Sequence, residues 1–230
     1  MKIVTYNIHR GRSVTGRPIL GEVALALDSL GADVIACQEV VGVDIDGHAD
    51  QAAWLADRLG MQARFVVNPT TRHCPLANAT LSRVPIDAHA NLDLSIRGFE
   101  NRGALRTVLA PSMDVWNVHL GLTARQRAEQ WRRLCAALHE APRALVVCGD
   151  FNDWSGLLRG LIERFGLVNA LHRARRHGRA TFPARRPWFR LDRLYYRSLE
   201  LVDAEVLRGA PWTGLSDHLP VVATFAEPAR

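Results

Sequence analysis

Short apolar runs rich in β-branched residues recur along the chain, and each has a polar side chain at one end. Runs of this kind, bounded by turn residues, are typical of buried strands. A side chain at the rim of a buried strand is held by a rigid scaffold, so these polar groups are expected to face a single crevice. The polar residues are Asn7, Glu39, His119, Asp150 with Asn152, Asp192, and Asp217 with His218.

The chemistry of these side chains narrows the possible function. Carboxylates bind a hard divalent cation, an imidazole paired with a carboxylate transfers protons near neutral pH, and neutral amides donate hydrogen bonds to a phosphate. A divalent-metal phosphoesterase needs this collection. No Cys-x-x-Cys or Cys/His cluster indicates zinc, and Cys37, Cys135 and Cys148 are expected to be buried reduced thiols.

Strand and helix patterns alternate along the chain without a linker-like segment. Strands are expected at residues 2–8, 33–38, 62–67, 77–82, 103–110, 113–119, 144–149, 191–197, 200–207 and 220–225. Helices are expected near residues 19–30, 50–59, 123–140 and 155–165. Asp50 caps the second of these helices, Gly60 ends it, and Thr123 with Gln126 forms a capping box for the third. This order predicts two sheets packed face to face between helical layers, in one domain that spans residues 1–230.

Six short segments of the sequence resemble the motifs of a known family. In chain order they are TYNIH, QE, NVHL, GDFN, LDRLYY and SDHLP, and they run from Asn7 to His218. They resemble the motifs of the endonuclease/exonuclease/phosphatase superfamily, the deoxyribonuclease I-like metal-dependent phosphoesterases. The resemblance implies an α+β, four-layer αββα sandwich of two mixed sheets flanked by helices, with the site at one end of the strands. It also implies hydrolysis of a phosphate ester by in-line attack of water.

Glu39 is the principal candidate for the metal ligand. A carboxylate directly after a buried strand must be paired or bound to a cation, and a salt bridge at the strand end is the alternative. The resemblance implies that Asn7 and Asp217 lie beside the same cation. Hard oxygen ligands suit Mg²⁺, for which Mn²⁺ is a possible substitute.

The resemblance assigns catalytic roles to five residues. His218 contacts the scissile phosphate or activates water, and Asp192 fixes its tautomer. Asp150 accepts a proton from the attacking water or orients it, and Asn152 donates to phosphate oxygens as charge builds. His119 hydrogen-bonds the phosphate and protonates the leaving group. Which of Asp150 and His218 is the general base stays open.

Three further residues are candidates for contacts with the substrate. Asn78, in ANATLSR, resembles the family's GNAxLSR segment, with anchoring of a loop as the alternative. Arg102 stands where an arginine that reaches the phosphate is common in the family. The alternative is that Arg102 is a solvated charge on the surface. His9 is the third candidate. His9 and His119 stand where the abasic-site endonucleases carry other residues, which argues against a DNA-repair role and leaves the phosphoesterase assignment intact.

Residues 173–193 hold eight arginines, with Asp192 as the one acid. With a net charge of +6 for the chain, this stretch favours an anionic phosphate-ester partner. The alternatives are a solvated basic loop and a contact with a nucleic-acid backbone or a lipid headgroup. Trp188, Phe189 and Trp212 either stack on bases or insert into a lipid surface, or they pin their loops to the core, which is the favoured interpretation.

Nucleic acid is the leading substrate class, ahead of phospholipid, sphingomyelin-type or inositol-phosphate substrates and small phosphate esters. A catalytically dead binding module on the same scaffold is disfavoured, because none of the expected site residues is missing. No apolar run approaches the ~20 residues of a membrane span, and the first strand begins at residue 2. We therefore expect a cytoplasmic monomer whose contact with a membrane is at most peripheral.

Overall fold

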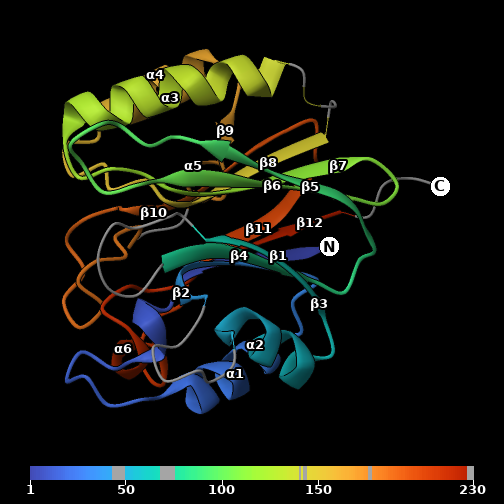
Figure 1. Ribbon diagram of the computed structural model, residues 1–230, viewed down its shortest axis with the longest axis vertical. Coiled ribbons are helices and arrows are strands. Elements are labelled where there is room, and N and C mark those ends of the chain that lie inside the picture. Colours follow the sequence, from blue (N-terminus) through green and yellow to red (C-terminus); the bar gives the residue numbers. More distant parts are fainter. Residues whose placement is uncertain (43–49, 68–75, 140, 142–143, 176–177, 227–230) are drawn as a thin grey trace.

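Two mixed β-sheets pack face to face in the computed structural model, which describes residues 1–42, 50–67, 76–139, 141, 144–175 and 178–226 (Figure 1). Among these residues each sheet has six strands. The first sheet has the order β11-β12-β1-β2-β4-β3, formed by Leu201–Val206, Val221–Phe225, Lys2–Asn7, Val34–Val41, Leu76–Ser82 and Gln62–Val67. The second has the order β5-β6-β7-β8-β10-β9, formed by Ile86–Asp93, Gly103–Leu109, Met113–His119, Ala144–Asp150, Asp192–Arg197 and Val168–Asn169.

Helices cover the outer face of each sheet. The first sheet carries α1 (Leu20–Asp28), α2 (Gln51–Leu59) and α6 (Trp212–Leu215), and the second carries α3 (Ala124–His139) and α4 (Leu157–Arg164) (Figure 1). The short α5 (Ala170–Arg173) packs against β10 and β11. The predicted four-layer αββα sandwich is confirmed. No helix in the described part of the chain is long and apolar enough to cross a membrane.

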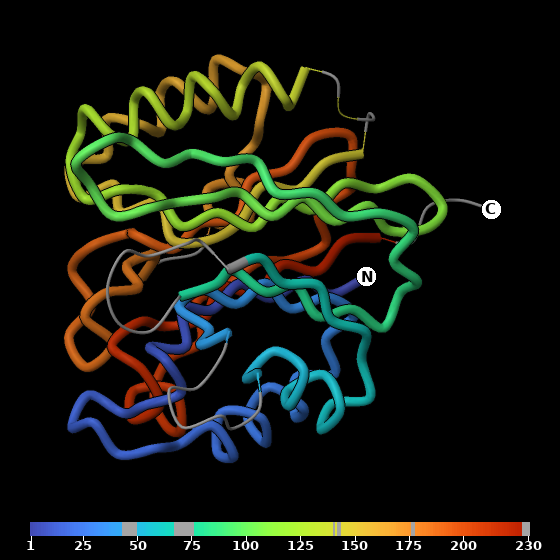
Figure 2. Tube along the Cα trace, viewed as in Figure 1, coloured from blue at the N-terminus to red at the C-terminus, as the bar shows by residue number. Residues whose placement is uncertain are grey.

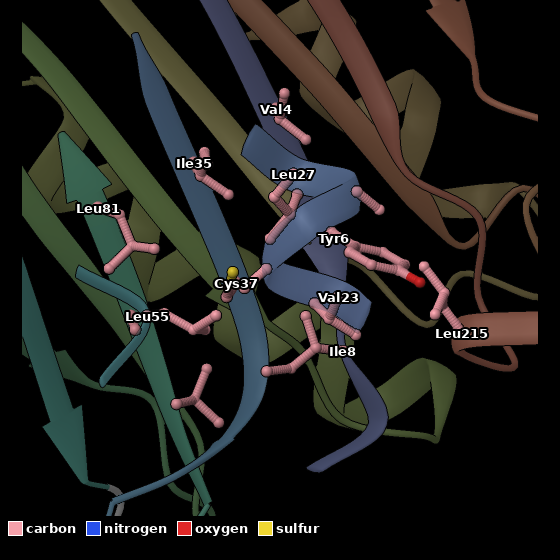
Figure 3. Packing of buried hydrophobic residues seen from close by; sticks show 14 of the residues in the cluster. Val4, Tyr6, Ile8, Val23, Leu27, Ile35, Cys37, Leu55, Leu81 and Leu215 are labelled. Carbon is pink, nitrogen blue, oxygen red and sulfur yellow. The ribbon is translucent and has the colours of Figure 1, made fainter. Parts of the chain in front are cut away.

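Both faces of the central strands are buried, because side chains of a strand alternate between its two faces. In β2, Ile35 and Cys37 pack toward α1 and α2, whereas Val34 and Ala36 belong to the core between the sheets. Figure 3 shows Ile35 and Cys37 beside Leu27 of α1 and Leu55 of α2. A strand enclosed on both sides reads as a continuous apolar run, which explains why these strands were recognisable from the sequence.

The free thiols follow this packing. Cys37 and Cys148 are buried within strands, and burial raises the pKa of each thiol to about 12. Cys135, in α3, is partly exposed, and burial raises the pKa of its thiol to about 11. The expected burial is confirmed for Cys37 and Cys148, whereas Cys135 is only partly buried.

The predicted helix caps are present. The Asp50 side chain accepts from the Ala52 amide at 2.8 Å, and Gly60 ends α2 with φ +61°. Thr123 and Gln126 exchange two side-chain to backbone hydrogen bonds of 3.0 and 3.2 Å ahead of α3. Each bond satisfies a backbone group that the helix itself leaves without a partner.

The two-residue strand β9 was not predicted, and two further expectations about the strands were wrong. Strand β5 was not predicted, because it lies at an edge of its sheet and most of its residues are exposed, so it carries no apolar run. Glu39 does not follow β2, which was expected to end at residue 38. It lies inside this strand, where the register with β4 shifts between Cys37 and Val40, and it has φ +56°. An irregularity of this type redirects a side chain, and it turns Glu39 toward the strand ends of the other sheet.

Candidate active site

Six of the predicted residues meet at one end of the sandwich. The first sheet supplies Asn7 at the end of β1, Glu39 from β2, and His218 just before β12; the second supplies His119, Asp150 and Asp192. The register of β7, β8 and β10 sets His119 and Asp192 directly opposite Asp150. The tube in Figure 2 shows this end at the left, where β1 finishes and the orange segment enters β10. A cavity of about 240 Å³ lies here, lined by residues that include Glu39, His119, Asp150, Asn152 and His218.

Asp150 is the centre of the site. Its Oδ2 lies 3.3 Å from Asn7 Nδ2, 3.5 Å from His119 Nε2 and 3.8 Å from His218 Nε2. Its Oδ1 accepts from the backbone amide of Asn152 at 2.9 Å. Burial, which outweighs the nearby His218 and is reinforced by Asp192, raises the pKa of Asp150 to about 6. The carboxylate is therefore a stronger base than one in water.

Gly149 fixes the backbone that carries Asp150. A Cβ atom at this position would lie 1.9 Å from the carbonyl oxygen of Val118, and the residue has φ +139°. Only glycine tolerates both the close approach and this region of backbone conformation. The glycine of the GDFN segment thus allows β8 to press against β7, which sets the 3.5 Å approach of His119 to Asp150.

His218 and Asp192 form a buried pair. Nδ1 of His218 lies 2.8 Å from Oδ2 of Asp192, and the backbone amides of the two residues donate to Ser216 Oγ and Thr181 Oγ1. Burial opposes the charged form of the imidazole, but the carboxylates of Asp192 and Asp150 outweigh it and raise the pKa of His218 to about 10. The ring therefore carries a proton on both nitrogens at neutral pH, with Nε2 directed toward Asp150.

His119 differs from His218 in its charge. Burial, assisted by the cations Arg102 and His218, holds the pKa of His119 well below the usual value of 6.5. It is a neutral imidazole at pH 7, with Nε2 3.5 Å from Asp150. The pocket thus holds one charged and one neutral imidazole on either side of a single carboxylate.

Asn7 joins two carboxylates. Its Nδ2 lies 3.3 Å from Oε1 of Glu39 and 3.3 Å from Oδ2 of Asp150, while its Oδ1 accepts from the backbone amide of His9 at 3.1 Å. The exposed Arg10 side chain pairs with Glu39, with Nε 3.9 Å from Oε2. Because the charge of His218 is already paired with Asp192, Glu39 and Asp150 keep a net negative charge, which a hard divalent cation would neutralise. The donor set therefore fits a metal such as Mg²⁺.

Asp150, Asp192 and His218 also form a compact group, with one ligand atom of each within 4.8 Å of the others. In this group, however, Nδ1 of His218 is already hydrogen-bonded to Asp192. This group is therefore better suited to transferring a proton than to binding a metal as a complete set of ligands.

Asn152 and Arg102 line the cavity as predicted, but each is also engaged elsewhere. Asn152, with φ +48°, donates its Nδ2 to the carbonyl of Leu120 at 2.9 Å. Arg102 is buried rather than solvated, so the surface-charge alternative is wrong. Its Nη2 pairs with Glu100 at 2.8 Å, and its buried Nε has no hydrogen-bond partner among the described residues.

Five predicted site residues lie outside this cavity lining: Asn7 and Asp192, which contact residues of the lining, and Asn78, His9 and Asp217. The amide of Asn78 donates to the backbone carbonyls of Gly103 and Asn117, at 2.9 and 3.2 Å, and so ties β4 to the second sheet. The ring of His9 contacts the carbonyl of Arg12 at 3.1 Å. Asp217 is half-buried beside the site, where its carboxylate accepts from Ser216 Oγ at 3.3 Å.

A polar network behind the site was missed. Nε2 of Gln38 donates to Oδ1 of Asn117 at 2.8 Å, and the Asn117 amide donates to the carbonyls of Cys37 and Ala79, both at 2.9 Å. These buried bonds connect the two sheets directly beneath the pocket. Both residues belong to the QE and NVHL segments, and a buried amide next to a site residue was the available signal.

The loop aromatics divide into two groups. Trp212 is buried, with its ring 5.7 Å from that of Tyr6, which confirms the core-pinning interpretation. For Trp188 that interpretation was wrong, because 77% of its surface is exposed. Phe189 is partly exposed and packs edge-on against Trp154, at 5.0 Å between ring centroids.

The chain belongs to the endonuclease/exonuclease/phosphatase family, whose model matches residues 4–218. It is 34% identical to the uncharacterized protein YbhP of Escherichia coli K12 over 244 aligned residues, which cover 96% of this chain and 94% of YbhP. Members of the family are generally dependent on a divalent metal.

Solved structures show the same fold at low sequence identity. A family protein from Leptotrichia buccalis superposes with a TM-score of 0.81 at 18% identity, covering 99% of this chain and 100% of that chain. The mannosyl-6-phosphatase of Bacteroides thetaiotaomicron gives 0.76 at 14%, with the same two coverages. The 3′ phosphatase NExo of Neisseria, bound to a product DNA hairpin, gives 0.74 at 17%, again covering 99% and 100%.

Proposed function

We propose that the protein is a divalent-metal-dependent hydrolase that cleaves a phosphodiester or a phosphomonoester by in-line attack of water. One observation carries this proposal. A single carboxylate oxygen, Oδ2 of Asp150, lies between 3.3 and 3.8 Å from the amide of Asn7 and the Nε2 atoms of His119 and His218. A base surrounded by hydrogen-bond donors in a buried pocket is suited to a reaction in which a proton leaves water while charge builds on phosphate oxygens.

The metal in this proposal is Mg²⁺, with Mn²⁺ as a substitute. Glu39 and Asp150 would hold it with Asn7, and Asp217 is the predicted neighbour on the C-terminal side. When bound, the cation supplies positive charge to the phosphate. Its fit rests on the two carboxylates that meet at the Asn7 amide, because the nearby charged His218 is already paired with Asp192.

We assign proton removal to Asp150. The hydrogen bond of 2.8 Å to Asp192 holds a proton on Nδ1 of His218, and this carboxylate stabilises the charged ring. His218 then donates from Nε2 to a phosphate oxygen instead of acting as the base. His119 donates a hydrogen bond to the phosphate or to the leaving oxygen, and Asn152 and Arg102 contact the remaining phosphate oxygens.

Nucleic acid is the substrate class that we favour. The basic segment 178–193 borders the pocket through Phe182 and Leu191, and a positive surface beside the reactive group suits a polymer of phosphodiesters. NExo acts on DNA and has the same fold, which supports the choice without deciding it.

A phospholipid or inositol-phosphate substrate is the second candidate. The exposed apolar side chains near the pocket favour it: Trp188 is 77% exposed, and Leu157, at the start of α4, is 72% exposed. Aromatic and leucine side chains beside cations are the composition of surfaces that lie on anionic membranes.

Hydrolysis of bis-para-nitrophenyl phosphate tests the proposed reaction. We expect turnover with Mg²⁺ or Mn²⁺, loss of turnover in EDTA, and recovery when metal is returned. Loss in the Asp150→Asn variant, with an unchanged melting temperature, links the activity to this pocket. Activity that persists in EDTA, or that Asp150→Asn leaves intact, would contradict the proposal. A panel of DNA, RNA, sphingomyelin, phosphoinositides and inositol phosphates then separates the substrate classes.

A further inference from the structure

A second cavity, of about 250 Å³, adjoins the candidate active site. The two cavities share Trp154 as a wall, and consecutive residues divide between them: Asn152 lines the active site, whereas Asp153 lines the second cavity. The ring of Trp154 is held edge-on between Phe182 and Phe189, at 5.4 and 5.0 Å. The wall that Trp154 forms between the two cavities is therefore held in place by the packing of these rings. We call the second cavity the basic pocket and define it by Arg159, His172, Arg179, Arg190 and the wall residues Trp154 and Trp188.

The cations of the basic pocket come from three parts of the chain. Arg159 lies on α4, His172 on α5, and Arg179 and Arg190 on the segment that precedes β10, drawn in orange in Figure 1. His172 Nε2 lies 3.3 Å from Nη1 of Arg159. Burial, together with the neighbouring Arg179 and Arg159, lowers the pKa of both His172 and Arg190, as expected where cations crowd together.

The acids that line the basic pocket are already engaged. Asp153 pairs with Arg193 at 3.0 Å, lies 3.9 Å from Arg127, and accepts from the Leu158 amide at 3.1 Å. Asp192 is bonded to His218. Glu163 lies 3.6 Å from Arg159, so this arginine is partly neutralised. Within the described residues, Arg179 and Arg190 have no carboxylate within salt-bridge distance, and the pocket keeps an uncompensated positive charge.

The segment that carries these two arginines is fixed by backbone bonds. Thr181 and Phe189 are joined by a bond of 2.7 Å, Trp188 donates to Phe182 at 2.8 Å, and Leu219 donates to Thr181 at 2.9 Å. Arg208 donates to the carbonyls of Gly178 and Ala180, on both sides of Arg179. Nε of Arg193 donates to the carbonyl of Arg190 at 2.9 Å. The pocket is thus preorganised, so binding would not require this backbone to become ordered.

Of the arginines in the basic stretch, the structure separates those that serve the fold from those that are available. Arg193 is buried and paired with Asp153, so it supports the wall between the two cavities. Arg185 and Arg186 are exposed outside the pocket lining, as is Arg175. Arg176 and His177 lie outside the described residues. Arg179 and Arg190 line the pocket and have no carboxylate partner among the described residues.

We propose that the basic pocket binds a second phosphate group of the substrate, on the far side of Trp154 from the phosphate that is hydrolysed. The inference rests on the proposed phosphoesterase reaction and adds a substrate class to it: compounds with two phosphate groups close together. Guanidinium groups match phosphate oxygens in geometry and charge, and the pocket is smaller than the ~300–1,000 Å³ of sites for whole drug-sized ligands. Adjacent phosphates of a nucleic acid and the phosphates of a bisphosphorylated lipid headgroup share this chemistry.

Binding of inorganic phosphate, measured by calorimetry in EDTA, tests the pocket separately from catalysis. The variant Arg179→Gln/Arg190→Gln is compared with Arg185→Gln/Arg186→Gln, which removes the same charge from the same segment outside the pocket. We expect at least about a tenfold weaker affinity in the first variant and a change below twofold in the second, because each lost contact is a charge-assisted hydrogen bond. Asp150→Asn should leave phosphate binding intact. Equal losses in the two arginine variants, or an adventitious ion only, would overturn the proposal.

Two pairs of substrates then identify the source of the second phosphate. One pair is the thymidine dinucleotide with and without a 5′-phosphate. The other is vesicles that contain phosphatidylinositol with and without a ring phosphate. The extra phosphate should lower KM at least about fivefold for one pair, and the pocket variant should abolish this advantage. No advantage in either pair would overturn the proposal. If no substrate is hydrolysed but the pocket still binds phosphate, the result would contradict the proposed function and leave the proposed phosphate site standing. The single variants Arg179→Gln and Arg190→Gln decide the matter if the double variant melts early.

Discussion

The candidate active site and the basic pocket share one wall but are built differently. In the active site, buried groups at the ends of central strands from both sheets contact each other: Asp150 alone approaches an amide and two imidazoles. In the basic pocket, partly exposed arginines from a helix and a long segment line an open cavity, and two of them lack a counter-charge among the described residues. The first arrangement is suited to moving protons within fixed distances, and the second to attracting an anion. If each pocket has its own role, substitutions should separate turnover from substrate affinity.

Asp150→Asn should have the largest effect on activity. It keeps the shape of the side chain but removes the proposed base and a ligand of the cation, so kcat should fall by about 10⁴-fold. KM for a substrate with two phosphates should change much less, because the basic pocket is untouched. Steady-state kinetics with bis-para-nitrophenyl phosphate and a bisphosphorylated substrate measure both. A variant that loses affinity while keeping kcat would reverse the roles of the two pockets.

His218 and Asp192 should act as a unit. The imidazole is useful only while its carboxylate, 2.8 Å away, holds the tautomer and the charge, so His218→Ala and Asp192→Asn should each lower kcat by about 10³-fold. The double variant should lose little more than either single one. Kinetics on all three variants, with circular dichroism as a check on folding, make the comparison. Losses that multiply would show that the two side chains work independently.

The sequence was sufficient to predict most residues of the candidate active site but few of those that form the basic pocket. Asn7, His119, Asp150 and Asp192 could be found because they directly adjoin strands that are buried on both faces and therefore read as apolar runs. Glu39 was found for an incomplete reason: it lies within β2 at a register shift, and a bulge leaves no periodic signal. The exposed strand β5 was missed because it carries no continuous apolar run, although its apolar and polar side chains alternate.

Basic residues were recognisable as a stretch but not as a pocket. Arg159 and His172 come from α4 and α5, and only the tertiary packing of the chain brings them to Arg179 and Arg190. Likewise, the sequence could not separate Arg193 from its neighbours. Its partner Asp153 is 40 residues away in the chain, and the pairing depends on how β8 and β10 lie side by side. Long-range contacts between charged groups carry no local pattern that a single sequence displays.

Two glycines, one at each pocket, should differ in their contribution to stability. Gly149→Ala puts a Cβ atom 1.9 Å from the Val118 carbonyl, so the free energy of unfolding should fall by about 4 kcal/mol or more. Gly156, which lines the basic pocket, has φ +75° and nothing within 4 Å of a new Cβ, so Gly156→Ala should cost only about 1 kcal/mol. Urea unfolding of both variants measures the difference. Equal losses would mean that the close contact of β7 and β8 does not hold the active site.

The smallest effect concerns the pH dependence of anion binding. Burial, with Arg179 and Arg159, lowers the pKa of His172 below 6.5, and Glu163 and Arg190 complete the charges around it. The ring is therefore neutral at pH 7 and gains a charge as the pH falls below its usual titration range. Sulfate, which keeps its charge over this range, should bind a fewfold more tightly at pH 5 than at pH 7. His172→Gln should remove the increase. An unchanged increase in that variant would assign the titration elsewhere.

The central claim is that strand ends from both sheets together form one site for a divalent cation and a phosphate ester. Crystals soaked in Mn²⁺ test it most directly, through the anomalous signal of the metal. The account predicts a peak within ligand distance of Glu39 on the first sheet and of Asp150 on the second, beside Asn7, and loss of the peak in the Glu39→Gln variant. Manganese found only at remote surface carboxylates, with none between the two sheets, would contradict it.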